Sequence, residues 1–211
     1  MEESEIKQIV ADQHKYFQSG RTLPVAERVR ALKRLKAAIL SHEAEIHQAL
    51  RSDLGKSAAE SYMCETGLAL SEISWMTAHT AHLAKEHRVR TPLAQYVSRS
   101  FKKPSPYGTV LIMSPWNYPF LLTVDPLADA VAAGNTAVVK PSAYSPATSA
   151  AIAKLVRECF APEYVTVVTG GRRENGSLLD QHFDKIFFTG SQTVGREVLR
   201  RSADGSCSAN I

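Results

Sequence analysis

The spacing of apolar residues along the chain changes near residue 104. Before this point apolar residues recur at intervals of three and four, which predicts amphipathic helices over 24–50 and 58–86. Pro24 suits a first helical turn, and Gly55 lies just past the end of the first segment. Residues 94–101 then alternate loosely, as an edge strand does. The core positions predicted for the first segment are Val25, Val29, Leu32, Leu35, Ile39, Ile46 and Leu50.

After residue 104 short runs rich in β-branched and aromatic residues alternate with helical patterns. The runs lie at 109–113, 136–139, 165–168 and 185–188, and the helical patterns lie near 120–133, 146–158, 173–180 and 193–201. This alternation predicts an α/β fold in which N-terminal helices precede a parallel sheet with right-handed crossovers. Because such sheets bind ligands beyond the carboxyl ends of their strands, the residues after each strand are the candidates for function.

Composition narrows the class of protein. An apolar fraction of 44% is ample for a core, and no stretch has the roughly 18 apolar residues that a membrane-spanning helix needs. The net charge of +4 is spread thinly, and the basic run Arg28–Lys36 alternates with apolar residues, which favours a solvated helix face over a nucleic-acid arm. The acidic N-terminus does not resemble a signal peptide. Three separated cysteines suit a reducing cytosol and argue against a structural metal, so we expect a cytoplasmic protein without a metal site.

Three of the predicted strands are followed by residues with candidate chemistry. Asn117 lies between Pro115 and Pro119, which restrict the backbone, so its amide could donate to an oxyanion in the cleft. The alternative, which the local chemistry favours, is that Asn117 caps the next helix. Lys140 could reach sugar hydroxyls or phosphate, or it could be a solvated lysine. Thr169–Gly171 follows the third strand and permits close backbone approach, but it could equally be an ordinary turn.

The loop after the fourth strand, 189–195, runs into a helix and carries Gly190 and Gly195. Glycine removes side-chain obstruction, and the unpaired amides of a helix start attract anions, so the loop is typical of a phosphate site. The dinucleotide pattern GxGxxG is absent. Arg196 and Glu197 also stand where a P-loop requires Lys and Ser or Thr, which argues against nucleoside-triphosphate hydrolysis.

Taken together and in order, the segments "PYGTVLIMSPWNYPF" (106–120), "AAGNTAVVKPS" (132–142) and "FFTGSQTVG" (187–195) resemble the aldehyde dehydrogenase superfamily, and the short region before them resembles its class 3 branch. The resemblance covers residues 1 to about 203. It implies an N-terminal helical region with an edge strand over 1–103, a Rossmann-like NAD(P)-binding region over 104–203, and a divergent tail over 204–211. It also implies that Asn117 is the oxyanion donor. The cofactor-binding residues that it implies are Pro115, Trp116, Lys140, Ser142, Phe188, Gly190, Ser191, Val194 and Gly195.

The resemblance also implies an activity and a partner. The family oxidises small-molecule aldehydes to carboxylic acids with NAD or NADP, using a cysteine nucleophile and a glutamate base, and the complete protein is expected to form a homodimer. Ala143 stands where the family often has a glutamate that binds ribose hydroxyls, so the choice between NAD and NADP is open.

The two catalytic groups are not found in the chain. The family's spacing places the base just beyond residue 211, and Cys64, Cys159 and Cys207 do not fit the nucleophile's motif. We therefore expect an N-terminal portion that is inactive alone. The alternative is a non-catalytic nucleotide-binding or interaction protein that retains the fold.

Overall fold

The structure is a computed structural model that describes residues 1–204 and 208–210. Its centre is a parallel sheet in the order β5-β4-β3-β6-β7. The strands are β3 (Thr109–Met113), β4 (Thr136–Lys140), β5 (Val165–Val167), β6 (Lys185–Phe188) and β7 (Ser208–Asn210). The helices that connect them are α6 (Leu121–Ala133), α7 (Pro146–Cys159), α8 (Arg172–Leu179) and α9 (Gln192–Asp204). The predicted fold class is therefore confirmed, and every predicted strand and helix after residue 104 is present.

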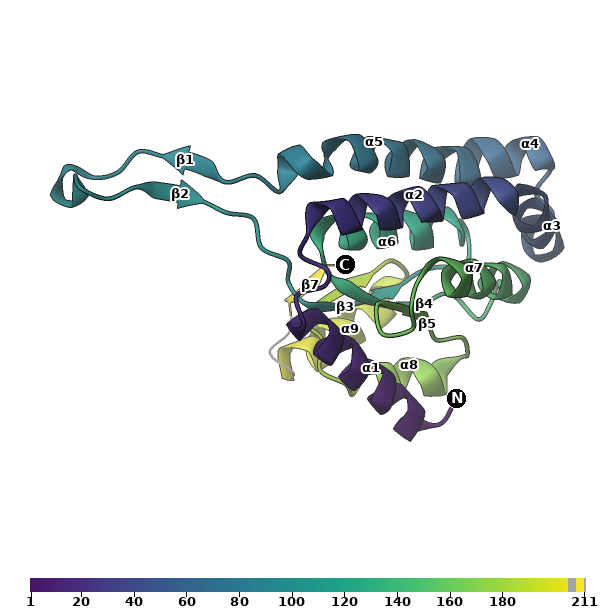
Figure 1. The fold of residues 1–211 in the computed structure, drawn as a ribbon. Helices are drawn as coiled ribbons and strands as arrows, with labels where there is room; N and C mark the ends of the chain where they lie inside the picture. Colours follow the sequence, from purple (N-terminus) through teal and green to yellow (C-terminus); the bar gives the residue numbers. More distant parts are fainter. Residues whose placement is uncertain (205–207, 211) are drawn as a thin grey trace.

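Helices cover both faces of this sheet (Figure 1). One face carries α6 and α7, and the other carries α8, α9 and the N-terminal helix α1 (Glu3–Gln18). An outer layer packs on α6 and α7 and consists of α2 (Val25–Ser41), α3 (Glu43–Leu54) and α5 (Gly67–Leu83). Between α3 and α5 lie the short helix α4 (Ala58–Ser61) and one π-helical turn, η1 (Tyr62–Thr66). The N-terminal helices thus pack on the region that carries the strands.

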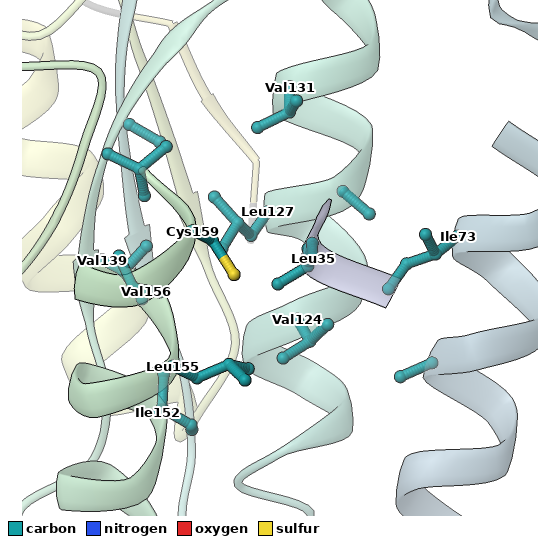
Figure 2. Close-up of a cluster of buried hydrophobic side chains, with 14 of the residues drawn as sticks. Leu35, Ile73, Val124, Leu127, Val131, Val139, Ile152, Leu155, Val156 and Cys159 are labelled. Carbon is teal, nitrogen blue, oxygen red and sulfur yellow. The ribbon is translucent and has the colours of Figure 1, made fainter. Parts of the chain in front are cut away.

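The strands are apolar on both sides because both faces are covered. In β3, Val110 and Ile112 join the cluster under α6 and α7, whereas Leu111 and Met113 join the cluster under α1 and α8. Figure 2 shows the first cluster, in which the Cys159 sulfur lies among aliphatic side chains of several elements. Seven core positions were predicted in the first helical segment. Leu32, Leu35, Ile39, Ile46 and Leu50 are buried, whereas Val25 and Val29 are half-buried.

The first helical segment is two helices rather than one. The backbone of His42 (φ −106°, ψ 13°) leaves the helical region and separates α2 from α3, although Gly55 ends α3 in the left-handed conformation (φ 70°) as expected. Helix α1 has no counterpart among the predicted elements. It packs on β3 and β4, and its buried Gln13 donates from Nε2 to the Ala137 carbonyl at 2.8 Å.

The predicted edge strand over 94–101 is wrong. Residues 93–95 form one 3₁₀ turn, η2 (Leu93–Gln95), and the strands β1 (His87–Val89) and β2 (Ser100–Lys102) pair with each other in an antiparallel hairpin. This hairpin projects away from the body of the molecule and does not join the central sheet (Figure 1). Alternation alone predicts a strand but not its partner, because strand pairing is decided by tertiary structure.

The predicted divergent tail also contributes to the sheet. Helix α9 continues to residue 204, and β7 pairs in parallel with β6, so that Lys185 lies opposite Ser208. A three-residue strand of small residues has no strong local signature, because strand preference depends on the surface that it packs against. Cys207 lies outside the described residues.

The basic run over 28–36 is only partly a solvated face. Arg28 is buried and its guanidinium donates to four backbone carbonyls, including Ala132 (3.3 Å) and Ala133 (3.1 Å) at the end of α6. Burial lowers the pKa of Arg28. A cation at a helix C-terminus satisfies carbonyls that have no partner within the helix, so Arg28 is a structural residue.

Three acidic side chains interact where α5 meets α6. Burial, together with the neighbouring carboxylates of Glu72 and Asp129, raises the pKa of Asp125 to about 7. The Oδ1 atom of Asp125 is buried and has no hydrogen-bond partner among the described residues. An ionised Asp125 is therefore unfavourable in the folded state.

Candidate functional site

The carboxyl ends of the central strands bring the predicted loops together at one edge of the sheet. Met113 ends β3 and lies between Lys140, which ends β4, and Phe188, which ends β6. The loop amides continue this pairing: Thr189 N–H donates to the Met113 carbonyl at 3.0 Å, and Ser114 N–H donates to the Lys140 carbonyl at 3.2 Å. The chain leaves β3 toward β4 and β5 on one side and returns to β6 on the other. The β3/β6 boundary is thus the topological switch point, where doubly wound sheets bind ligands.

The start of α9 lies directly after β6 at this switch point. The Ser191 hydroxyl accepts a hydrogen bond from the Val194 amide at 3.4 Å, and Gly195 N–H donates to the Ser191 carbonyl at 2.9 Å. The earlier amides of the first turn have no acceptor within the helix and are available to an anion. Ser191 and Val194 are both exposed. The loop therefore offers N–H groups and one hydroxyl, a donor set that fits a phosphate or pyrophosphate.

Position 190 needs glycine because of the neighbouring Phe188 side chain, not because of an unusual backbone angle. A Cβ atom at Gly190 would lie 2.6 Å from Cζ of Phe188, whose buried ring packs in the cluster under α1, α8 and α9. Gly190 thus allows the loop to turn closely over this ring while its own backbone stays exposed.

Lys140 is neither solvated nor freely reaching into the cleft. It is 3% exposed, and its Nζ donates to the carbonyls of Gly170 (2.7 Å) and Pro141 (2.8 Å). Burial lowers the pKa of Lys140 to about 8, an effect that the Glu174 carboxylate opposes. An ammonium group has three donors, so one remains for a ligand, and Lys140 also ties the loop after β4 to the loop after β5.

The loop after β5 is a specialised turn rather than an ordinary one. Gly170 has φ 134°, and a Cβ there would lie 2.4 Å from a Glu174 carboxylate oxygen. That carboxylate accepts from Gly171 N–H at 2.7 Å, a hydrogen bond that lowers the pKa of Glu174. The sequence analysis missed Glu174. A glutamate three residues into a helix start is a known capping pattern and could have identified it.

The loop after β3 exposes Trp116 and Asn117 at the same edge. Asn117 does not cap α6, so the helix-cap alternative is wrong: the cap position is Phe120, and the amides of Phe120 and Leu121 donate to Glu65 instead. Within the described residues no hydrogen bond involves the Asn117 side-chain amide. Its N–H₂ group is therefore available to a ligand.

The loop after β4 continues into α7 with Ser142 and Ala143. Ser142 is half-buried, and its hydroxyl accepts from the Tyr144 amide at 3.2 Å, whereas Ala143 is exposed. The first turn of α7 is held by Asp53, which the sequence analysis missed. The Asp53 carboxylate accepts from the amides of Ala147 (3.1 Å) and Thr148 (2.7 Å). No local pattern identifies Asp53, because it lies about 95 residues away in α3.

The described cysteines lack an activated environment. Cys159 is buried between α2 and α7, and burial raises its pKa to about 11, so its thiol is part of the core and is not activated. Cys64 lies half-buried in the π-helical turn. The described residues contain no group of three or more His, Cys, Asp or Glu side chains that could hold a metal. In the same residues no helix is long and apolar enough to cross a membrane.

A cavity of about 470 Å³ lies elsewhere, between α1 and the β5 edge. It is lined by Ile9, Tyr16, Arg21, Pro162 and Thr166, among others, and contains none of the predicted site residues. Its lining mixes acidic and basic side chains. The loops at the strand ends therefore remain the better candidate site, because their donors converge.

Comparisons with known proteins agree with the fold. The family model described as "Aldehyde dehydrogenase family" matches residues 1–209, which extends the likeness beyond residue 203. A 4,4'-diaponeurosporen-aldehyde dehydrogenase of Staphylococcus aureus is 40% identical over 94% of the chain, and aldehyde dehydrogenase family 3 member H1 of Arabidopsis thaliana is 38% identical over 95%. The chain spans 43% and 41% of the lengths of these curated relatives.

Solved structures show the same fold. The substrate-bound state of a Staphylococcus aureus protein named AldH superposes with a TM-score of 0.95 at 39% identity, over 97% of this chain and 44% of that one. An NAD+ complex of an aldehyde dehydrogenase from Bacillus cereus superposes with a TM-score of 0.88 over 98% of this chain and 42% of that one. At 24% identity the second comparison supports the fold alone.

Proposed function

Because the chain belongs to the aldehyde dehydrogenase family, we propose that residues 104–203 bind NAD(P) for the oxidation of aldehydes to carboxylic acids by the whole protein. The relatives with the named activity are more than twice as long as this chain, so catalysis belongs to the proposal. The observation that carries it is the convergence of the α9 start, Lys140 and the Asn117 loop at the switch point of the sheet.

The donor set fits a dinucleotide. The first-turn amides of α9 and the Ser191 hydroxyl would hold the pyrophosphate, and the exposed Trp116 ring would lie beside it. Lys140 has a third donor for a ribose hydroxyl, and with a pKa of about 8 it is mostly cationic at neutral pH. Pro115, Ser142, Phe188, Val194, Gly190 and Gly195 would shape the groove. Bound NAD(P) would supply the hydride acceptor.

Asn117 would act on the aldehyde. Its side-chain N–H₂, which has no described protein partner, would donate to the carbonyl oxygen as negative charge develops there. Such a donor is effective only when it is held in place before the reaction, since reorganisation would cost part of the stabilisation. The residue does not move a proton; it stabilises an oxyanion.

A charge substitution at the start of α9 tests the cofactor site. Ser191→Asp retains a good helix cap, because aspartate is as favourable as serine at that position. It also places a carboxylate against the pyrophosphate, which at about 4 Å costs on the order of 1–4 kcal/mol. We expect an unchanged melting temperature and an NAD or NADP affinity at least about fivefold weaker, measured by calorimetric titration.

The matched control is Ser57→Asp. Ser57 caps α4 by accepting from the Glu60 amide at 3.1 Å, so the same substitution is made at another helix start. This control should leave dinucleotide affinity unchanged. If the unsubstituted chain binds neither NAD nor NADP, or if Ser191→Asp binds as well as the control, the cofactor site is not where we place it. The former result would favour an interaction protein that retains the fold.

A further inference from the structure

A buried ion pair lies behind the Asn117 loop. Lys56, just after α3, is 7% exposed, and Glu65, in the π-helical turn, is fully buried. Lys56 Nζ lies 2.5 Å from Glu65 Oε1. A buried ion pair is costly to desolvate, and replacement by apolar residues is often neutral or stabilising. Stability alone therefore does not account for this pair, and its other contacts indicate what it does.

Glu65 holds the C-terminal end of the Asn117 loop. Its second oxygen, Oε2, accepts from the amides of Phe120 (2.8 Å) and Leu121 (3.1 Å), where α6 begins. The cap residue of α6 makes no side-chain capping bond of its own. A carboxylate is favourable at a helix N-terminus because it pairs with free amides and with the helix dipole. Glu65 thus replaces the local cap that the sequence lacks.

Lys56 holds the same loop at Asn117 itself. Its Nζ donates to the main-chain carbonyl of Asn117 at 3.1 Å and lies 4.2 Å from the centroid of the Tyr118 ring. The ammonium group therefore contacts Glu65, a peptide group and an aromatic face at once. Each end of the segment 117–121 is attached to one member of the pair.

The π-helical turn is what carries Glu65. The turn η1 contains five residues, and Gly67 N–H donates to the Tyr62 carbonyl across it. A Cβ at Gly67 would lie 2.6 Å from that carbonyl oxygen, so glycine is needed for the turn to close. Single π-turns within α-helices often occur at functional sites, where they change the direction of side chains.

We infer that the Lys56–Glu65 pair is a positioning device that fixes the main chain of Asn117, and so the direction of its amide donor, before substrate binds. The inference rests on the proposed function of Asn117. Neither charged residue touches the cleft donors themselves; both act through the backbone of the loop. Removing either one leaves a buried charge without its partner, and the loop loses the attachment that the missing group made.

The test measures backbone order by ¹⁵N relaxation in the full chain. In the unsubstituted chain Asn117 and Tyr118 should have order parameters near those of rigid backbone, about 0.85. In Lys56→Met they should fall below about 0.6, the range of flexible backbone. Lys56→Arg, which keeps the charge and the donors, should restore most of the order. The control Lys154→Met breaks an exposed Lys–Glu pair (2.6 Å to Glu45) and should leave the loop unchanged.

A double variant separates positioning from stability. In Lys56→Met/Glu65→Met no unpaired charge remains buried, so the melting temperature should return toward the unsubstituted value. The order parameters of Asn117 and Tyr118 should nevertheless stay low. If Lys56→Met does not fold, this double variant decides the question. Order near about 0.85 in the double variant would overturn the inference. The measurement uses neither cofactor nor aldehyde, so failure of dinucleotide binding would overturn the proposed function separately.

Discussion

Replacement of Gly190 by alanine should destabilise the protein even though Gly190 is exposed. The new methyl group would lie 2.6 Å from Cζ of Phe188 and 3.2 and 3.3 Å from Cε1 and Cε2. Carbon atoms prefer separations of about 3.5–4.0 Å, so the ring or the loop must move by on the order of 1 Å. Phe188 is 7% exposed and packs with Leu111 and Ile186, so the ring has little room to yield.

The size of the effect follows from this packing. Forcing a methyl group into a well-packed region costs about 1–3 kcal/mol. For a chain of 211 residues, each kcal/mol lowers the melting temperature by about 2–4 °C, so we expect a decrease of roughly 2–12 °C. Because the same loop carries the proposed phosphate donors, NAD(P) affinity should fall as well.

The matched control is Gly176→Ala in α8. A Cβ there meets no atom within 4 Å, and alanine is favoured over glycine inside a helix by about 0.5–1 kcal/mol. Thermal unfolding followed by circular dichroism should thus show opposite signs for the two substitutions, and dinucleotide titration should show a loss only for Gly190→Ala. Equal melting temperatures for Gly190→Ala and the unsubstituted chain would refute the steric argument.

Further predictions concern stability, pH and cofactor choice. Asp53→Ala should lower the free energy of unfolding by about 1–2 kcal/mol, measured in urea, because α7 loses its cap. The pKa of Asp125 is raised to about 7 in the folded protein. Its contribution to the free energy of unfolding is therefore fully present below the ordinary aspartate pKa and is lost as pH rises through about 7. Asp125→Asn should therefore raise the melting temperature more at pH 8 than at pH 5; the reverse order would contradict the burial argument. Ala143→Glu should increase the ratio of NAD to NADP affinity by repelling a 2′-phosphate, as titration with both cofactors would show. The chain alone should not oxidise aldehydes, because Cys159 is buried with a raised pKa; steady formation of reduced cofactor that Cys207→Ser abolishes would contradict this.

The sequence predicted the loops of the candidate site but not the residues that hold those loops in place. Asn117 and Lys140 each come after an apolar run that ends close to a proline, so their place at the carboxyl ends of the strands was predictable. Lys56, Glu65 and Asp53 were not, since a charged residue in an amphipathic helix has the same local pattern whether it faces water or a distant backbone amide. Burial of such a residue is decided by the element that packs over it.

The sequence by itself determined the α/β class and, to within one residue, the bounds of four central strands, because strands buried on both faces form apolar runs that contrast with the helices between them. It also placed the loop around Gly190 and Ser191 at a helix start. Only the tertiary structure decided that residues 87–102 form a separate hairpin, that the predicted tail supplies a fifth strand, and that Arg28 is buried. The physical reason is that strand pairing and charge burial depend on partners far along the chain, whereas periodicity records only whether a position faces water or the core.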